Sequence, residues 1–203
     1  RSKYARARVV KIDSSKACAM EGVIGVLTAA DVPHNQVGHL IQDWDVMIAE
    51  GDVTRCIGDA VCLVVAETPE ILEKAKKAVK VTWEELEPVR NIEEARAEGA
   101  PRIHDSFFAF GNTVQLKDNV CQSRHVTRGD AKTALANAAH RVTRTFTTPF
   151  TEHAFLEPEC CVAMPYKNGV KIMSTDQGAY DTRKECAHMF GWDGEPERVV
   201  VQT

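Results

Sequence analysis

The stretch Asp59-Ala60-Val61-Cys62-Leu63-Val64-Val65-Ala66-Glu67-Thr68-Pro69-Glu70 decides the fold class of this chain. Its first part, residues 60–66, is a continuous apolar run, which is typical of a β-strand covered on both faces. Thr68 is a good helix N-cap, and Pro69 suits the first helical position. Glu70 carries a negative charge that suits the positive N-terminus of a helix. The stretch therefore predicts a strand that leads directly into a helix.

The residues that follow extend this unit to Leu86. Four apolar residues fall on one face of the predicted helix, namely Ile71, Leu72, Ala75 and Val79. Val79, Val81 and Trp83 then alternate with polar residues, as in a strand with one buried face. Residues 59–86 are therefore predicted to form a strand–helix–strand unit.

Two further strands are predicted on the N-terminal side of this unit. Residues 5–12 have a strand-like composition, and residues 23–27 form a second short apolar strand. Residues 28–31 offer a cap and a brief helical turn that Pro33 stops. Residues 34–53 are mixed in character and are predicted to be a loop.

The C-terminal half contains a second set of predicted elements. A connection at residues 93–101 leads to a domain boundary that we place between about residues 100 and 125. Asp130 is predicted to cap a helix that runs through Ala139, and residues 142–150 are predicted to form a Thr-rich strand.

A hairpin and a second helix are predicted after that strand. Asn168-Gly169 lies between apolar runs at residues 160–164 and 170–174, which is a hairpin signal. Residues 179–190 are predicted to be helical, and Gly191 stands where glycine often ends a helix. Val199 opens another strand. The pattern as a whole predicts an α/β (α+β) fold in two parts.

Composition and charge exclude several classes of function. Of the 203 residues, 44% are hydrophobic and 27% are charged, the ordinary balance for a soluble protein that buries a core. A formal net charge of -4 gives no basic footprint for nucleic acid or an anionic membrane. No apolar run approaches the roughly 20 residues that span a bilayer, and the N-terminus carries no signal-peptide core. We therefore expect a cytoplasmic location, with neither nucleic acid nor membrane as partner.

The cysteines do not indicate a disulfide framework or a metal site. The chain has 7 of them at irregular spacings, and an odd count argues against a set of paired bridges. No C-x-x-C motif is present, so we expect no zinc or iron–sulfur site within the chain. Cys160 and Cys161 would face opposite sides of a strand, and packing explains them better than redox chemistry.

Three groups of polar residues are candidates for chemistry, and each has a simpler structural interpretation. Arg128-Gly129-Asp130 is explained by a turn and a helix cap rather than by cell adhesion. An acidic and imidazole cluster, Glu152, His153, Glu157 and Glu159, is conceivable as a metal or acid/base site, but it is better explained by hydrogen bonds to backbone donors. The Gln177 amide, beside Gly178 at a strand-to-helix junction, is able to contact a ligand, although on these residues alone a capping or turn role explains it better.

A series of motifs resembles the large, molybdenum-binding subunit of the xanthine dehydrogenase/aldehyde oxidase family. Three stretches are similar to its "hammerhead" α/β domain, namely Tyr4-Ala5-Arg6-Ala7-Arg8-Val9, residues 22–33, and Gly58-Asp59-Ala60-Val61 with the unit that follows through Val89. Four more resemble the opening of its molybdopterin-binding region, namely Arg128-Gly129-Asp130, Phe155-Leu156-Glu157-Pro158-Glu159, Ser174-Thr175-Asp176-Gln177 and Val199-Val200-Val201. Because these motifs keep their order and spacing over nearly the whole chain, their combination is specific.

The resemblance implies a domain organisation. It predicts a hammerhead-type α/β domain at residues 1–104, a connecting segment at 105–125, and an incomplete mixed α/β segment at 126–203 from the N-terminal part of the molybdopterin-binding domain.

The resemblance also implies which residues lie near a cofactor. Gln177 matches the family glutamine whose amide lies beside the molybdenum centre. The family usually reads Ser-Thr-Gln here, whereas this sequence has Asp176 between Thr175 and Gln177. Glu157 matches a family position that we interpret as structural support. No catalytic residue is expected within the chain, because the family's general base is expected beyond Thr203.

Two functional hypotheses follow. The first is a fragment of a molybdenum hydroxylase that oxidatively hydroxylates a purine, another N-heterocycle or an aldehyde. The resemblance implies molybdopterin in that enzyme and iron–sulfur and FAD groups in partner domains or subunits, with no cofactor bound to this chain alone and no activity in isolation. The second is a non-catalytic binding or assembly module with the hammerhead fold. A homodimer of the chain through open hairpin edges is a further expectation.

Overall fold

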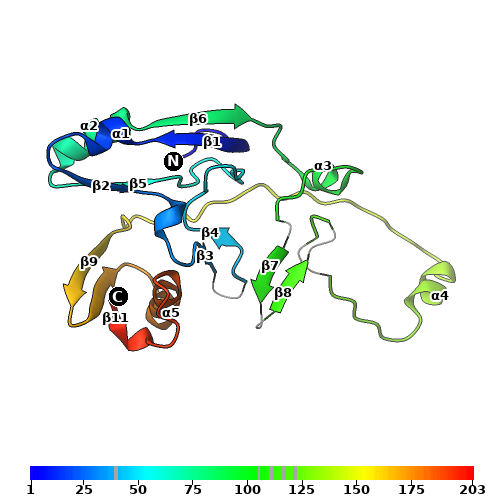
Figure 1. Ribbon diagram of the computed structural model, residues 1–203. Coiled ribbons are helices and arrows are strands. Elements are labelled where there is room, and N and C mark those ends of the chain that lie inside the picture. The colour runs from blue at the N-terminus through cyan, green and yellow to red at the C-terminus, as the bar shows by residue number, and fades with distance from the viewer. Residues whose placement is uncertain (39–40, 105, 110–111, 116–117, 121–122) are drawn as a thin grey trace. The chain divides into compact units, whose positions relative to one another are not determined.

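The structure is a computed structural model that describes residues 1–38, 41–104, 106–109, 112–115, 118–120 and 123–203 (Figure 1). The chain divides into two compact units. Unit 1 contains residues 1–119 and 160–203, and unit 2 contains residues 120–159. Nearly all the regular structure of the described chain lies in unit 1.

Two small antiparallel sheets form the N-terminal layer of unit 1 (Figure 1). Strand β1 (Ala7–Asp13) pairs with β6 (Lys80–Glu85), and β2 (Val23–Leu27) pairs with β5 (Leu63–Ala66). The short helix α1 (Ser15–Cys18) and the longer helix α2 (Pro69–Ala78) pack against each other beside these strands. Val9, Ile48 and Val61 form the buried core of this layer.

Helix α2 forms where the local sequence signals predicted it. The Thr68 hydroxyl accepts a hydrogen bond from the Ile71 amide at 3.3 Å, Pro69 occupies the first helical position, and Ala75 is the buried residue of the inner face. Lys76 and Lys77 lie in the last turn, where cations are favoured by the helix dipole. The predicted strand–helix–strand unit of residues 59–86 is therefore confirmed.

The first strand of that unit differs from the prediction in length and in cover. It begins at Leu63 rather than at residue 60, and its partner β2 is antiparallel. Leu27 and Leu63 face each other across the two strands with 41% and 54% of their surfaces exposed. The expectation of a strand covered on both faces is wrong here, because a continuous apolar run does not reveal that its sheet has only two strands.

The segments between these elements contain more regular structure than predicted. Residues 29–31 form the short helical turn η1 (Ala29–Asp31), where the Asp31 carboxylate accepts a hydrogen bond from the Thr28 amide at 2.7 Å, as expected of a capped turn. The predicted loop at 34–53 contains the two-residue strands β3 (Gln36–Val37) and β4 (Trp44–Asp45). The predicted connection contains helix α3 (Ile92–Arg96), which Asn91 caps through the Glu94 amide at 2.7 Å. Strands β7 (Ser106–Ala109) and β8 (Asn112–Gln115) form a further hairpin.

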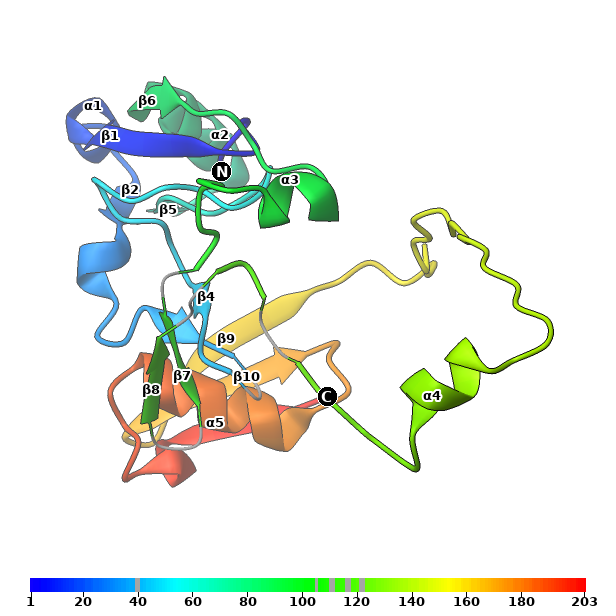
Figure 2. The same ribbon diagram turned by 90° about the vertical axis from the view of Figure 1, so that its right-hand side faces the viewer.

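A three-stranded sheet with one helix forms the C-terminal part of unit 1 (Figure 2). Strands β9 (Cys161–Tyr166) and β10 (Gly169–Ser174) form the predicted hairpin, and β11 (Val199–Gln202) lies parallel to β10. Helix α5 (Ala179–Met189) and the short turn η2 (Pro196–Arg198) connect β10 to β11. Gly191 adopts a φ of 73° just after α5, which is the backbone conformation that glycine supplies at a helix end. Ile172, Ala187 and Val199 form the core.

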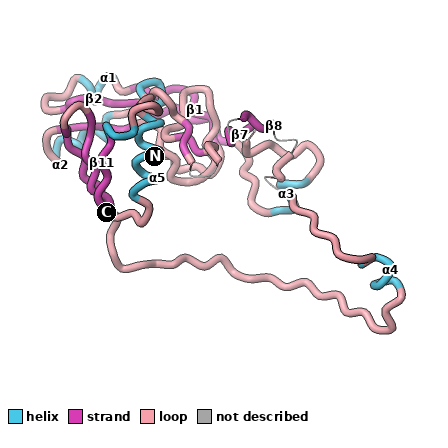
Figure 3. Tube along the Cα trace, turned by 90° about the horizontal axis from the view of Figure 1, so that it is seen from below, coloured by secondary structure: helices cyan, strands magenta, loops and turns pink. Residues whose placement is uncertain are grey.

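Unit 2 is mostly loop, with helix α4 (Ala131–Ala136) as its one described helix (Figure 3). The Asp130 carboxylate accepts a hydrogen bond from the Thr133 amide at 3.0 Å, which confirms the predicted cap, although the helix ends three residues before Ala139. The strand predicted at residues 142–150 is wrong, since this segment has no strand and Phe146 is 88% exposed. An extended segment becomes a strand only when a partner satisfies its backbone groups, and the described chain offers none here.

Among the described helices, none combines the length and the apolar composition needed to span a lipid bilayer.

Candidate functional site

The corner between β10 and α5 contains Gln177, the strongest site candidate from the sequence. Strand β10 ends at Ser174 and α5 begins at Ala179, so Gln177 lies at the strand-to-helix junction, where the sequence predicted it. Its side chain is exposed, and its amide forms no hydrogen bond with the described part of the chain. The carboxamide therefore presents a donor and an acceptor at the end of the sheet.

Asp176, rather than Gln177, makes the contacts that shape this corner. Its carboxylate accepts hydrogen bonds from the Gly178 amide at 2.7 Å and from the Thr182 hydroxyl at 3.0 Å. Loss of water around Asp176 acts to raise its pKa, but hydrogen bonds from Ser174, Thr182 and Gly178 outweigh this and bring the pKa below its ordinary value. The turn role that was an alternative for Gln177 is thus performed by its neighbour, and α5 has no side-chain cap. Among the described residues nothing competes with a ligand for the glutamine amide.

Glu157 and the other members of the acidic and imidazole cluster lie in unit 2, whereas Gln177 lies in unit 1. Glu152 and His153 form a neighbour contact, in which a Glu152 carboxylate oxygen lies 3.9 Å from Nδ1 of His153. Their side chains are 83% and 91% exposed. Open groups of this kind do not form a metal-binding arrangement within the described residues, and the supporting role of Glu157 remains a prediction.

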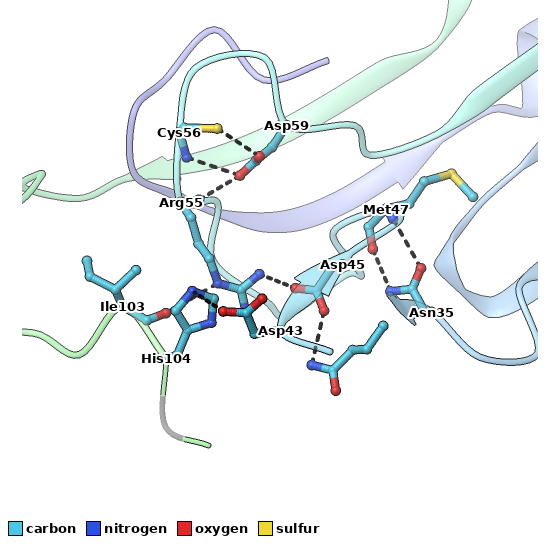
Figure 4. A network of polar contacts seen from close by, with 10 residues as sticks. Asn35, Asp43, Asp45, Met47, Arg55, Cys56, Asp59, Ile103 and His104 are labelled. Atoms are coloured by element: carbon cyan, nitrogen blue, oxygen red, sulfur yellow. Dashed lines mark hydrogen bonds and ion pairs between the residues drawn. The ribbon is translucent and has the colours of Figure 1, made fainter. Parts of the chain in front are cut away.

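A polar network that the sequence did not reveal joins three segments of unit 1 (Figure 4). The Arg55 guanidinium forms an ion pair with Asp45 and donates to the Ile103 carbonyl at 3.2 Å. Both side chains of the ion pair are mostly buried, with 22% and 11% of their surfaces exposed. Burial lowers the pKa of the adjacent His104, and the Arg55 charge adds to this, whereas Asp43 and Asp45 oppose it. His104 is therefore mainly neutral near pH 7, and its 3.9 Å contact with Asp43 is weak.

The same network explains the Gly58-Asp59 motif. Asp59 is buried, and its carboxylate accepts hydrogen bonds from the Arg55 amide at 2.6 Å, the Cys56 amide at 3.1 Å and the Cys56 thiol at 3.1 Å (Figure 4). The thiol contact with Asp59, together with burial, raises the pKa of Cys56. Gly58 closes the turn with a φ of 99°, a conformation that favours glycine. The motif holds the loop before the apolar run in one conformation.

A cavity of about 650 Å³ lies beside this network. Its lining includes four arginines, Arg6, Arg8, Arg55 and Arg102, together with Asp45 and His104. Arg6 donates to the Glu87 carbonyl at 3.1 Å, and Arg8 donates to the Gly51 carbonyl at 2.7 Å. Arg6, Arg8 and Arg55 are thus already bonded to neighbouring segments of the chain. The amide at the β10–α5 corner has no such bond within the described residues, and it is therefore the better candidate for ligand contact.

Two family models match the chain, and together they cover most of it. The first, "Aldehyde oxidase and xanthine dehydrogenase, a/b hammerhead domain", matches residues 1–87. The second, "Molybdopterin cofactor-binding domain", matches residues 113–203 and so includes the Gln177 corner.

Individual relatives agree with these models. The chain is 32% identical to the nicotinate dehydrogenase large molybdopterin subunit of Eubacterium barkeri, over 100% of this chain and 45% of that protein. It is also 32% identical to a probable xanthine dehydrogenase subunit of Bacillus subtilis, over 98% of this chain and 25% of that protein. The crystal structure of quinoline 2-oxidoreductase from Pseudomonas putida 86 superimposes with a TM-score of 0.77 at 28% identity, over 100% of this chain and 25% of that chain.

The chain thus spans less than half the length of these relatives. The hammerhead match covers β1 to β6, and the molybdopterin-domain match covers the β9–β11 sheet with α5. The expected α/β fold class is confirmed by both. The chain therefore belongs to the xanthine dehydrogenase and aldehyde oxidase family of molybdenum hydroxylases, of which it carries the a/b hammerhead domain and part of the molybdopterin cofactor-binding domain.

Proposed function

We propose that this chain is part of a molybdenum hydroxylase subunit that oxidatively hydroxylates a purine, another N-heterocycle or an aldehyde. The observation that carries the proposal is the free Gln177 amide at the β10–α5 corner, within the region that the cofactor-binding model matches. The substrate class is supported by the relatives, which are named for nicotinate, xanthine and quinoline.

The residues at the corner fit a molybdenum cofactor. When bound, that group supplies the electron-transfer chemistry that side chains lack. Gln177 would donate its amide N–H to the cofactor and accept through its oxygen, because no described residue occupies either group. Asp176 would keep the corner rigid through its contacts with Gly178 and Thr182, so that the amide is held ready for the ligand. We assign no general base to residues 1–203, and Glu157 is proposed only as structural support.

The activity of the holoenzyme compared with that of the isolated chain tests the proposal. We expect the enzyme purified with its full subunit to contain molybdenum and to hydroxylate at least one of three probes, namely a purine, a pyridine carboxylate and an aromatic aldehyde. The 203-residue chain alone is expected to hold no stoichiometric molybdenum and to form no product, since one cofactor contact without a base does not assemble a site. Metal analysis and product chromatography measure both.

Two outcomes would contradict this proposal. A holoenzyme that contains no molybdenum would point to the binding or assembly module instead. Tight stoichiometric molybdopterin in the isolated chain would show that residues 1–203 hold the group by themselves.

We also propose a domain organisation, partner subunits and a cellular location for the chain. Domain limits of 1–104, 105–125 and 126–203 are retained as proposals, together with iron–sulfur and FAD domains or subunits as electron acceptors. The relatives' names support the existence of partner subunits, because nicotinate dehydrogenase and xanthine dehydrogenase are named there as subunits. The iron–sulfur and FAD groups are what the family resemblance implies. A cytoplasmic location is proposed as well, and it is supported by the described cysteines, which are all free thiols.

Self-association of the isolated chain is expected through an open sheet edge. Strand β9 is an edge of its sheet, and Val162, Met164 and Tyr166 on one of its faces are 46%, 37% and 42% exposed. An edge strand with exposed apolar residues pairs readily with another copy. Size-exclusion chromatography with light scattering is expected to show a dimer whose fraction rises with concentration.

A lysine placed on the edge strand β9 provides the control for this prediction. Met164→Lys is expected to shift the chain toward monomer, because lysine on an edge strand opposes pairing. A parent chain that stays monomeric at every concentration would rule out the association.

A further inference from the structure

Two histidines and a carboxylate from separate segments of unit 1 meet at the end of helix α5. His34 precedes β3, His188 lies in the last turn of α5, and Asp193 follows that helix. One ligand atom from each of the three side chains lies within 4.8 Å of the other two. No other group of three histidine, cysteine or acidic side chains in the described part of the chain is gathered in this way.

The packing of α5 against β3 brings the segments together (Figures 1 and 2). The His34 amide donates to the Met189 carbonyl at 3.2 Å, which fixes the loop to the end of the helix. The two imidazole rings then lie with their centroids 4.5 Å apart at 62° to each other. Neither ring is free to leave without loss of these contacts.

Asp193 completes the cluster from the other side. Its Oδ1 lies 2.6 Å from Nδ1 of His188, and the His188 side chain is 21% exposed. A cavity of about 330 Å³ lined by both histidines, Asn35, Gln36 and Gln42 opens onto the cluster. That volume has room for an ion with bound water.

The electrostatics of this position favour a cation. The last carbonyls of the 11-residue helix α5 carry the negative end of the helix dipole, and His188 lies in its final turn. The Asp193 carboxylate adds a full negative charge next to the imidazoles. Two imidazole nitrogens with one carboxylate oxygen are a ligand set that suits Zn²⁺, with a fourth position left for water.

We propose that His34, His188 and Asp193 form a binding site for Zn²⁺ or a divalent ion of similar preference. The ion links the loop before β3 to helix α5 through these three side chains. Because these residues lie on opposite sides of the junction between the two family-matched regions, metal binding stabilises that junction. This site is separate from the Gln177 corner at the other end of α5.

Calorimetry with Zn²⁺ alone on the metal-free 203-residue chain tests the proposal. We expect one Zn²⁺ per chain, and a rise in Tm of roughly 5–10 °C at a free ion concentration about 100-fold above Kd. His34→Gln, His188→Gln and Asp193→Asn are each expected to lower the affinity at least about tenfold. His140→Gln, a matched change at an exposed histidine of unit 2, is expected to leave the affinity unchanged.

The exposed cysteines are the alternative ligands for the metal ion. An absorption spectrum with Co²⁺ distinguishes binding by cysteine from binding at the proposed site. The proposed site predicts visible d–d bands without a thiolate charge-transfer band, because its donors are nitrogen and oxygen. The Tm of each metal-free variant is compared with the parent, so that loss of binding is not confused with loss of folding. Absence of one-to-one binding, a thiolate band, or an affinity that survives all three substitutions would overturn the proposal.

Discussion

Gln177→Leu in the cofactor-loaded enzyme is expected to lower kcat/KM by about a hundredfold. Leucine has a similar volume but lacks the amide, so the change removes a donor and an acceptor without creating a cavity. Loss of one positioned hydrogen-bond donor at a reacting centre costs about 10²–10³ in rate, or roughly 3 kcal/mol. The side chain is exposed in the chain itself, so folding is expected to be unaffected. Steady-state kinetics at matched molybdenum content measure the effect.

Two further variants control this result. Gln177→Glu keeps the shape and one acceptor oxygen but removes the N–H donor. We therefore expect kcat/KM to fall, by no more than it falls in Gln177→Leu. Gln36→Leu makes the same change at an exposed amide of β3, where it removes only a 3.3 Å hydrogen bond to Asp45, and is expected to leave the rate unchanged. An unaltered kcat/KM in Gln177→Leu would remove this residue from the site.

Asp59→Ala is expected to lower the free energy of unfolding by about 2–4 kcal/mol. The buried Asp59 carboxylate accepts from the amides of Arg55 and Cys56, and alanine leaves both amides without that partner. A buried donor that loses its acceptor costs roughly 1–3 kcal/mol, and both of these amide bonds are part-buried, so the two together account for the size of the effect. Urea denaturation of the 203-residue chain gives the value.

The matched control lies seven residues earlier in the same loop. Asp52 is exposed, and Asp52→Ala is expected to change the unfolding free energy by less than about 0.5 kcal/mol. A similar small change in Asp59→Ala would show that the Gly58-Asp59 motif does not hold the loop.

Local signals explain what the sequence predicted about the fold. Thr68 and Pro69 begin helix α2, and Gly191 ends α5, because each acts on residues a few positions away. The β9–β10 hairpin forms where Asn168-Gly169 predicted it, although its two turn residues are Lys167 and Asn168 and Gly169 already pairs with Tyr166 in the sheet. The failed strand at 142–150 required a partner from elsewhere, and β3 and β4 exist through pairing across a loop. Pairing between distant segments leaves little trace in one sequence.

The candidate site likewise has one part that local sequence patterns predict and one part that depends on contacts in the folded chain. The position of Gln177 at a strand-to-helix corner was predictable, because the apolar run and the helix on either side of it are local patterns. That its amide is free depends on Asp176, whose contacts with Gly178 and Thr182 appear only in the folded corner. Arg55 with Asp45, and His34 with His188, meet through packing of segments that no spacing rule connects.

A crystal structure of the cofactor-loaded holoenzyme tests the central claim most directly, because it places the Gln177 amide relative to the molybdenum cofactor. The predicted result is an amide within hydrogen-bonding distance of the group at the molybdenum centre, with residues 63–85 forming β5, α2 and β6 as described here. A holoenzyme in which the cofactor lies elsewhere and Gln177 faces solvent would contradict the proposed site.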